Sequence, residues 1–143
     1  MPQHRQTQRL PHSPEQLYDL VVDVAKYPEF IPWCVAARVK SKTETTMVAD
    51  LMVGFKVFRE RYTSEIHMTP KSRVLVEQSA GPFKHLRNSW AFTPADDGGS
   101  TVDFFIDFEF SSALLQRAAQ PVFSEATRRM VSAFEKRAQA LYG

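Results

Sequence analysis

The chain has 143 residues and a formal net charge of +2 at pH 7, and hydrophobic residues make up 43% of it. This length suits a single domain, 1–143, and the composition is that of a globular protein with one core, not of a disordered chain. The charge is too small to indicate a protein organised around nucleic acid, so we expect no DNA partner. Cys34 is the only cysteine, which excludes an internal disulfide and fits a reducing compartment.

The sequence gives no sign of a targeting or membrane-spanning segment. Its first ten residues lack the apolar stretch of a signal peptide, and its longest apolar run, 33–37, is far shorter than a membrane span. We therefore expect a cytoplasmic protein, with contact to the inner membrane only at its surface.

A strand followed by two short helical segments is predicted for the N-terminal part of the chain. Ser13, Pro14 and Gln16 supply an N-cap, a first-turn proline and a capping-box partner, and apolar residues then recur at helical spacing up to Val24. The pattern predicts a helix from about Pro14 to Val24. The next stretch, 27–34, is rich in aromatic residues, and its prolines leave room only for a short helical turn or a loop.

From 35 to 110 the apolar residues recur every second position, and turn signals at 69–72, 81–82 and 96–99 divide this segment into about six strands. With the first strand, this predicts an antiparallel sheet of about seven strands. The clearest alternation places Val102, Phe104, Ile106, Phe108 and Phe110 on one face. Gly54 is expected at a bulge or bend.

Two further strands are predicted to turn large side chains inward. One carries Phe58 and Tyr62, and the other carries Trp90 and Phe92. Glu60 and Asn88 share these inward faces, where an unpartnered polar group is costly. They either pair within a sealed core or donate and accept hydrogen bonds to a ligand.

The C-terminal segment predicts one amphipathic helix of about 30 residues, with a kink or brief interruption at Pro121. Its apolar stripe includes small residues such as Ala126 and Ala133. The architecture is therefore α+β, with a curved sheet covered by a long helix. Whether the inward aromatic residues fill a core or line a cavity stays open at this point, since both arrangements give the same pattern.

The motif Tyr-Pro-x-Phe-Ile-Pro-Trp-Cys at 27–34 resembles the signature of the coenzyme Q-binding family. That family belongs to the START-like, helix-grip or polyketide cyclase/dehydrase superfamily, which also includes ribosome-association toxins of bacteria. The stretches 51–60, 81–92 and 107–110 are similar to the same family. The likeness covers nearly the whole chain.

The resemblance implies a helix-grip fold that encloses a polyprenyl quinone such as ubiquinone, with no required cofactor. Its members act as lipid chaperones that support respiratory electron transport. Carried onto this chain, the expected entrance is Tyr27, Pro28, Phe30, Pro32 and Trp33. Together with the inward pattern, the expected cavity residues are Phe58, Glu60, Tyr62, Asn88, Trp90, Phe92, Phe104, Phe108, Phe123 and Met130.

Two other functions stay open in the sequence. Basic residues such as Lys84, Arg128 and Lys136 would suit binding to a ribosomal subunit and inhibition of translation initiation, or contact with a membrane surface, although they also read as a solvated face. An aromatase or cyclase would need a polar cavity, for which Glu60 is the only inward acid. The four histidines are scattered and no catalytic or metal-binding spacing occurs, so we expect a binding protein and not an enzyme.

Overall fold

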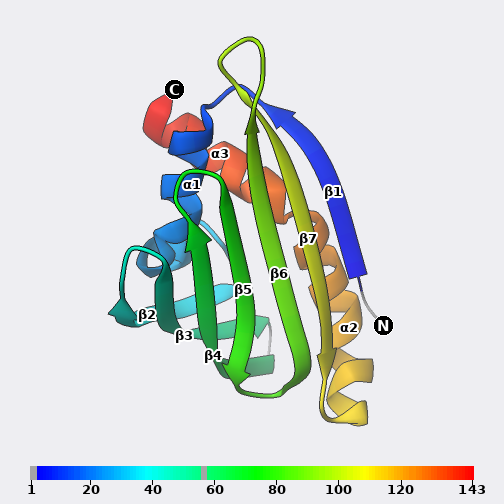
Figure 1. Ribbon diagram of the computed structural model, residues 1–143. Helices are drawn as coiled ribbons and strands as arrows, with labels where there is room; N and C mark the ends of the chain where they lie inside the picture. The colour runs from blue at the N-terminus through cyan, green and yellow to red at the C-terminus, as the bar shows by residue number, and fades with distance from the viewer. Residues whose placement is uncertain (1–2, 56–57) are drawn as a thin grey trace.

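The structure is a computed structural model that describes residues 3–55 and 58–143, without the side chains of residues 55, 58, 122 and 123. Seven strands form one antiparallel sheet in the order β1-β7-β6-β5-β4-β3-β2, with helices packed on one of its faces (Figure 1). In chain order the elements are β1 (Gln3–Leu10), α1 (Pro14–Val22), η1 (Val24–Glu29), β2 (Cys34–Lys42), β3 (Thr46–Phe55), β4 (Phe58–Thr69), β5 (Arg73–Ala80), β6 (Phe83–Pro94), β7 (Ser100–Phe110), α2 (Ala113–Arg128) and α3 (Met130–Tyr142).

The helical pair after β1 is confirmed. The Ser13 side chain accepts a hydrogen bond from the Gln16 backbone N–H, and the Gln16 side chain accepts one from the Ser13 N–H, which completes the predicted capping box. Helix α1 ends at Val22, two residues earlier than predicted, and the chain continues at Val24 as a 3-10 helix that contains Pro28. The short helical turn expected in the aromatic stretch is this 3-10 helix.

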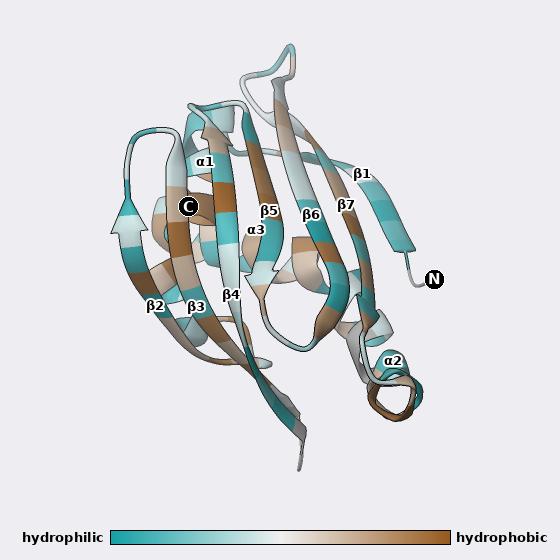
Figure 2. Ribbon diagram, turned by 60° about the horizontal axis from the view of Figure 1, so that its bottom comes forward, coloured by the Kyte–Doolittle hydropathy of each residue, from teal (hydrophilic) through white to brown (hydrophobic). Residues whose placement is uncertain are grey.

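The strand predictions are confirmed most clearly in β7, where every second side chain is buried. Apolar and polar bands also alternate along the other strands in Figure 2. The turns at 69–72 and 96–99 contain Lys71 and Gly98, whose φ angles of 64° and 88° lie in the left-handed region. The expected irregularity near Gly54 lies one strand away: the register shifts between Cys34 and Ala36 in β2. Gly54 itself pairs regularly with Arg59.

The C-terminal helix is broken at Arg129 and not at Pro121, which corrects the sequence prediction. Helix α2 runs through Pro121, and α3 starts at Met130 in a different direction (Figure 1). Pro121 and Arg117, whose carbonyl loses its helical partner, are both exposed, so water can satisfy that carbonyl without a break. At Arg129 the backbone N–H bonds to both Glu125 and Ala126, the pattern of a tightened last turn.

The core lies between the concave face of the sheet and the helices α1 and α3. Phe134 of α3 is only 2% exposed, and its ring centroid lies 4.8 Å from that of Trp90 and 5.1 Å from that of Phe30. Trp90 also contacts Phe104, with centroids 4.7 Å apart. This chain of rings joins the sheet, α3 and the segment after η1. It fixes α3 across the sheet.

Candidate functional site

An internal cavity of about 90 Å³ lies between the middle of the sheet, the η1–β2 segment and α3. The strands contribute side chains such as Leu51, Tyr62 and Ile66, and α3 contributes Met130 and Phe134. None of the described residues that line it carries a charge. The cavity is therefore suited to neutral, apolar groups.

A second cavity of about 60 Å³ lies beside the first, toward α2. The two share several lining residues, including Trp33, Tyr62 and Met130. Phe108 and Ala126 line only the second cavity. Met130 is unbranched and flexible, so its rotamer can change at low cost.

Six of the predicted residues line the first cavity. They are Tyr27, Trp33, Tyr62, Asn88, Trp90 and, from α3, Met130. Phe30 and Pro32 instead line a groove on the surface, and Pro28 is exposed. The predicted entrance is thus divided between the inside and the outside of the same segment, with Trp33 reaching both.

Other predicted cavity residues lie elsewhere. Phe104 and Phe92 are 0% and 4% exposed and pack against Trp90, so they fill the core. Glu60 is partly exposed near the end of β4 and is not among the residues that line either cavity. The side chains of Phe58 and Phe123 lie outside the described part of the structure.

Residues that the sequence reasoning did not select also line the cavity. Ser64, Cys34 and Phe134 are the most informative of them. Ser64 lies in the inward register of β4, between Tyr62 and Ile66, so the alternation of that strand was a usable signal. Phe134 was visible in the helix stripe, but nothing in the stripe distinguishes a residue beside a cavity from one within a filled core.

Most polar groups at the cavity already have partners inside the protein. The Asn88 amide donates to the Phe105 carbonyl at 2.9 Å and accepts from the Trp90 indole N–H at 3.2 Å. The Tyr27 hydroxyl donates to the Val21 carbonyl. Asn88 is therefore a structural link between β6 and β7, in agreement with the sealed-core alternative for that residue.

Burial governs the acid–base properties of the groups around the cavity. It raises the pKa of Tyr27 and of Tyr62 far above the usual value for a phenol. It also raises the pKa of the Cys34 thiol to about 11. Cys34 is 5% exposed and its Sγ lies 3.7 Å from the Ala36 carbonyl oxygen. Cys34 is thus a buried thiol, and its high pKa makes it a poor nucleophile at neutral pH.

A surface groove of about 540 Å³ runs along α3 beside the segment after η1. One wall contains Phe30, Pro32 and Trp33, and the other contains the cations Arg129, Lys136 and Arg137. The Arg137 guanidinium lies 5.2 Å from the Phe30 ring centroid and 2.8 Å from a Glu29 carboxylate oxygen. The groove is basic and aromatic, and Trp33 separates it from the internal cavity.

Among the described residues, no group of three or more His, Cys, Asp or Glu side chains is arranged to hold a metal ion. No helix in that part of the chain is long and apolar enough to cross a membrane.

Residues 10–135 match the family described as "Polyketide cyclase / dehydrase and lipid transport". The chain belongs to this family. The ribosome association toxin RatA of Vibrio cholerae is 40% identical over 131 residues, which are 92% of this chain and 91% of that protein. A mitochondrial coenzyme Q-binding protein, COQ10 homolog B of Xenopus laevis, is 39% identical over 145 residues, which cover 99% of this chain but only 59% of the frog protein.

A solved structure with a similar sequence agrees with the fold. The 18 kDa protein CC1736 of Caulobacter crescentus is 36% identical and superposes with a TM-score of 0.78. The match covers 100% of this chain and 99% of the Caulobacter protein. The polyketide cyclase family and its helix-grip sheet, predicted from the motif at 27–34, are therefore confirmed. The names of the relatives divide between ligand binding and ribosome association.

Proposed function

We propose that this chain binds a polyprenyl quinone such as ubiquinone and carries it as a lipid chaperone. The observation that carries the proposal is an internal cavity with no charged group among its described lining residues, placed directly behind the 27–34 motif. The coenzyme Q-binding name of the frog relative supports the quinone as the ligand. On this proposal the whole chain is one cytoplasmic domain that needs no cofactor.

Quinone binding by this site would be driven mainly by burial of the ligand's apolar tail. Each CH₂ group removed from water contributes about 0.8 kcal/mol, so a prenyl chain needs few polar contacts to bind well. A charged lipid head would lose its hydration without gaining a partner at the cavity wall. The lining therefore favours a neutral head group.

The ligand must enlarge the cavity in order to bind. Typical small-molecule pockets hold about 300 Å³ or more, whereas the two cavities here enclose about 90 Å³ and about 60 Å³. The break at Arg129 lies next to Met130, which lines both cavities, and most of the described side chains of α2, before the break, are exposed. We infer that α2 pivots about Arg129 and that Met130 moves aside when the ligand binds.

The site gives no support for catalysis. An aromatase or cyclase needs an acid or base that reaches its substrate, and Glu60, the only acid proposed for that role, is not at the cavity wall. The Cys34 thiol stays protonated at neutral pH. Non-enzymatic binding is the function that these side chains favour.

The test is mass spectrometry of the organic extract of protein purified gently from its native host. A polyprenyl quinone should co-purify in near-stoichiometric amounts with the wild-type protein, and less of it with Val53→Phe, which places a ring at the wall that the two cavities share. A folded, unrelated protein from the same host sets the membrane background. Extracts that match this background would contradict the proposal.

The groove offers a route from a membrane to the cavity, because Trp33 is part of both walls. A basic and aromatic surface suits the interface of an anionic bilayer. Co-sedimentation with anionic vesicles should therefore weaken in Trp33→Ala, and equal sedimentation of the two proteins would exclude this loop as the contact.

Ribosome association is the second candidate, and it rests on the name of the Vibrio relative together with the cations of the groove. Glu29 and Glu125 neutralise part of that charge, through Arg137 and Arg129. This candidate predicts salt-sensitive co-sedimentation with a ribosomal subunit that is reduced by Lys136→Glu and unchanged by Lys40→Glu on the exposed edge strand β2. Absence of subunit binding at low salt would eliminate it.

A further inference from the structure

Ser64 is a polar group of the cavity whose hydroxyl has no hydrogen-bond partner of normal geometry among the described residues. The residue is 0% exposed. Ser64 lines the cavity from the middle of β4. Buried hydroxyl groups almost always have a partner because an unsatisfied one is costly, so this exception needs an explanation.

The groups around Ser64 do not supply that partner. Its cross-strand neighbours are Ala49 in β3, which has no polar side-chain atom, and Gln78 in β5. The Gln78 amide is already bonded to both the N–H and the carbonyl of Phe83, at 2.9 Å and 2.7 Å. The strand is also irregular here, since the β4–β5 register shifts between Thr63 and Ser64. Such bulges often aim a side chain at a binding site.

Tyr62 places a second hydroxyl on the same inward face, two residues before Ser64. Burial is the main reason that the pKa of Tyr62 is raised, and the nearby Ser64 side chain lowers it by less. The two hydroxyls therefore lie near each other, but the Ser64 hydroxyl does not reach the distance and angle of a hydrogen bond to the phenol. The other polar side chains at the cavity, Asn88, Tyr27 and Trp90, are engaged within the protein.

We propose that the Ser64 hydroxyl donates a hydrogen bond to a neutral carbonyl oxygen on the head of the bound ligand, with Tyr62 as its neighbour in the same site. This inference rests on the proposed function and deepens it, because it states the chemical class of the ligand head and where it lies. A quinone oxygen satisfies the serine, whereas a hydrocarbon leaves it unpaired and a carboxylate finds no cation. The head then lies against β4, and the tail extends toward Trp33 and Met130.

The test compares two ligands and three proteins by equilibrium dialysis. The ligands are a ubiquinone with a saturated ten-carbon tail and decylbenzene, which has the same tail on a ring without oxygen. The proteins are the wild type, Ser64→Ala and Ser89→Ala. Ser89 lies on the outward face of β6 and makes the matched control.

Ser64→Ala should bind the quinone about fivefold to tenfold more weakly than the wild type, the loss expected for one hydrogen bond. Its affinity for decylbenzene should be unchanged, and Ser89→Ala should bind both ligands as the wild type does. The melting temperature of ligand-free Ser64→Ala should equal or exceed that of the wild type, since the substitution removes an unsatisfied group.

Equal quinone affinity of Ser64→Ala and the wild type would overturn the inference while leaving quinone binding intact. A lower melting temperature of the ligand-free variant would also overturn it, because the hydroxyl would then have a partner within the protein. If the wild type binds neither ligand, the proposed function itself fails. Tyr62→Phe provides a second readout and should weaken quinone binding in the same direction.

Discussion

Two regions of the same concave sheet face differ in how they are filled. In the packed region, formed by Phe92, Val102 and Phe104, all three residues are at most 4% exposed, and none of them lines either of the two cavities. In the cavity region, formed by Val53, Tyr62 and Ser64, equally inward positions border empty space. Both regions follow the same two-residue period. The period decides which side chains point inward, but the opposite layer decides whether they find partners.

The source of the difference is visible in the residues across from each region. Phe104 meets the Trp90 ring, with centroids 4.7 Å apart, and Trp90 in turn meets Phe134 of α3. Across from Ser64, β3 offers Ala49 and β5 offers Gln78, whose amide is bonded to Phe83, while α3 contributes Met130 and Phe134 at the cavity wall. The small residues of β3 and β4 leave the space that the rings of β6 and β7 occupy elsewhere.

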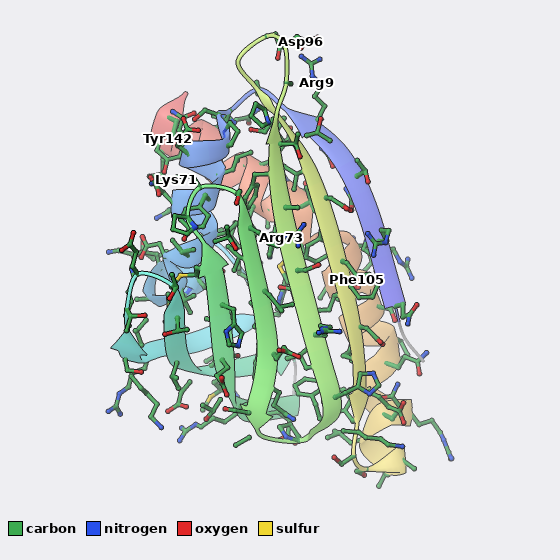
Figure 3. All side chains as sticks on the ribbon, viewed as in Figure 1. Arg9, Lys71, Arg73, Asp96, Phe105 and Tyr142 are labelled. Carbon is green, nitrogen blue, oxygen red and sulfur yellow. The ribbon has the colours of Figure 1, made fainter. Side chains whose placement is uncertain are left out.

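The largest expected effect is in the packed region. Phe104→Ala should lower the free energy of unfolding by about 3–5 kcal/mol, because the ring is fully buried and its neighbours cannot close the gap. Chemical denaturation measures this loss. Phe105→Ala is the matched control: its ring lies on the outer face of β7 (Figure 3), under the Arg5 guanidinium at 4.7 Å. It should cost about 1 kcal/mol or less. Similar losses in both variants would mean that Phe104 is not packed as described.

A single added methylene should have opposite effects in the two regions. Val102→Ile overfills a site that is 1% exposed and should destabilise the protein by about 1–3 kcal/mol. Val53→Ile adds a methylene that extends from the wall into the cavity, and it should stabilise the protein by about 0.5–1 kcal/mol. Denaturant midpoints of the two variants give the comparison. Destabilisation of both by the same amount would show that the cavity region is as tightly filled as the packed one.

Much of the fold could be predicted because it depends on local or periodic features. The capping box at Ser13 and the alternation of β7 are of this kind. The position of the helix break could not be predicted from Pro121, because an exposed proline in a helix is tolerated when water satisfies the freed carbonyl. The break at Arg129 instead accompanies the change of direction between α2 and α3.

The site was less predictable than the fold for a related reason. The motif at 27–34 led to Tyr27 and Trp33, which line the cavity. Large aromatic side chains suggested a binding surface at Phe92 and Phe104, yet those rings have ring partners and fill the core. Ser64 gave no signal by size or type. Its proposed role rests on the lack of a hydrogen-bond partner among the described residues, which is a property of the surrounding structure and not of the residue.

A change of pH should act at the edge of the cavity region. Burial raises the pKa of Cys34 from its ordinary value of 9.0 to about 11, so the unfolded chain loses this proton at a lower pH than the folded one. The resulting stabilisation is complete below about pH 9 and is lost as the pH rises toward 11. Between these pH values the free energy of unfolding of the wild type should fall by about 1–2 kcal/mol more than that of Cys34→Ala. Tyr27 and Tyr62 are present in both proteins. The difference between the two curves of stability against pH therefore gives the contribution of the Cys34 thiol. Parallel curves would mean that Cys34 ionises as an exposed cysteine does, and that solvent reaches the cavity wall in the absence of ligand.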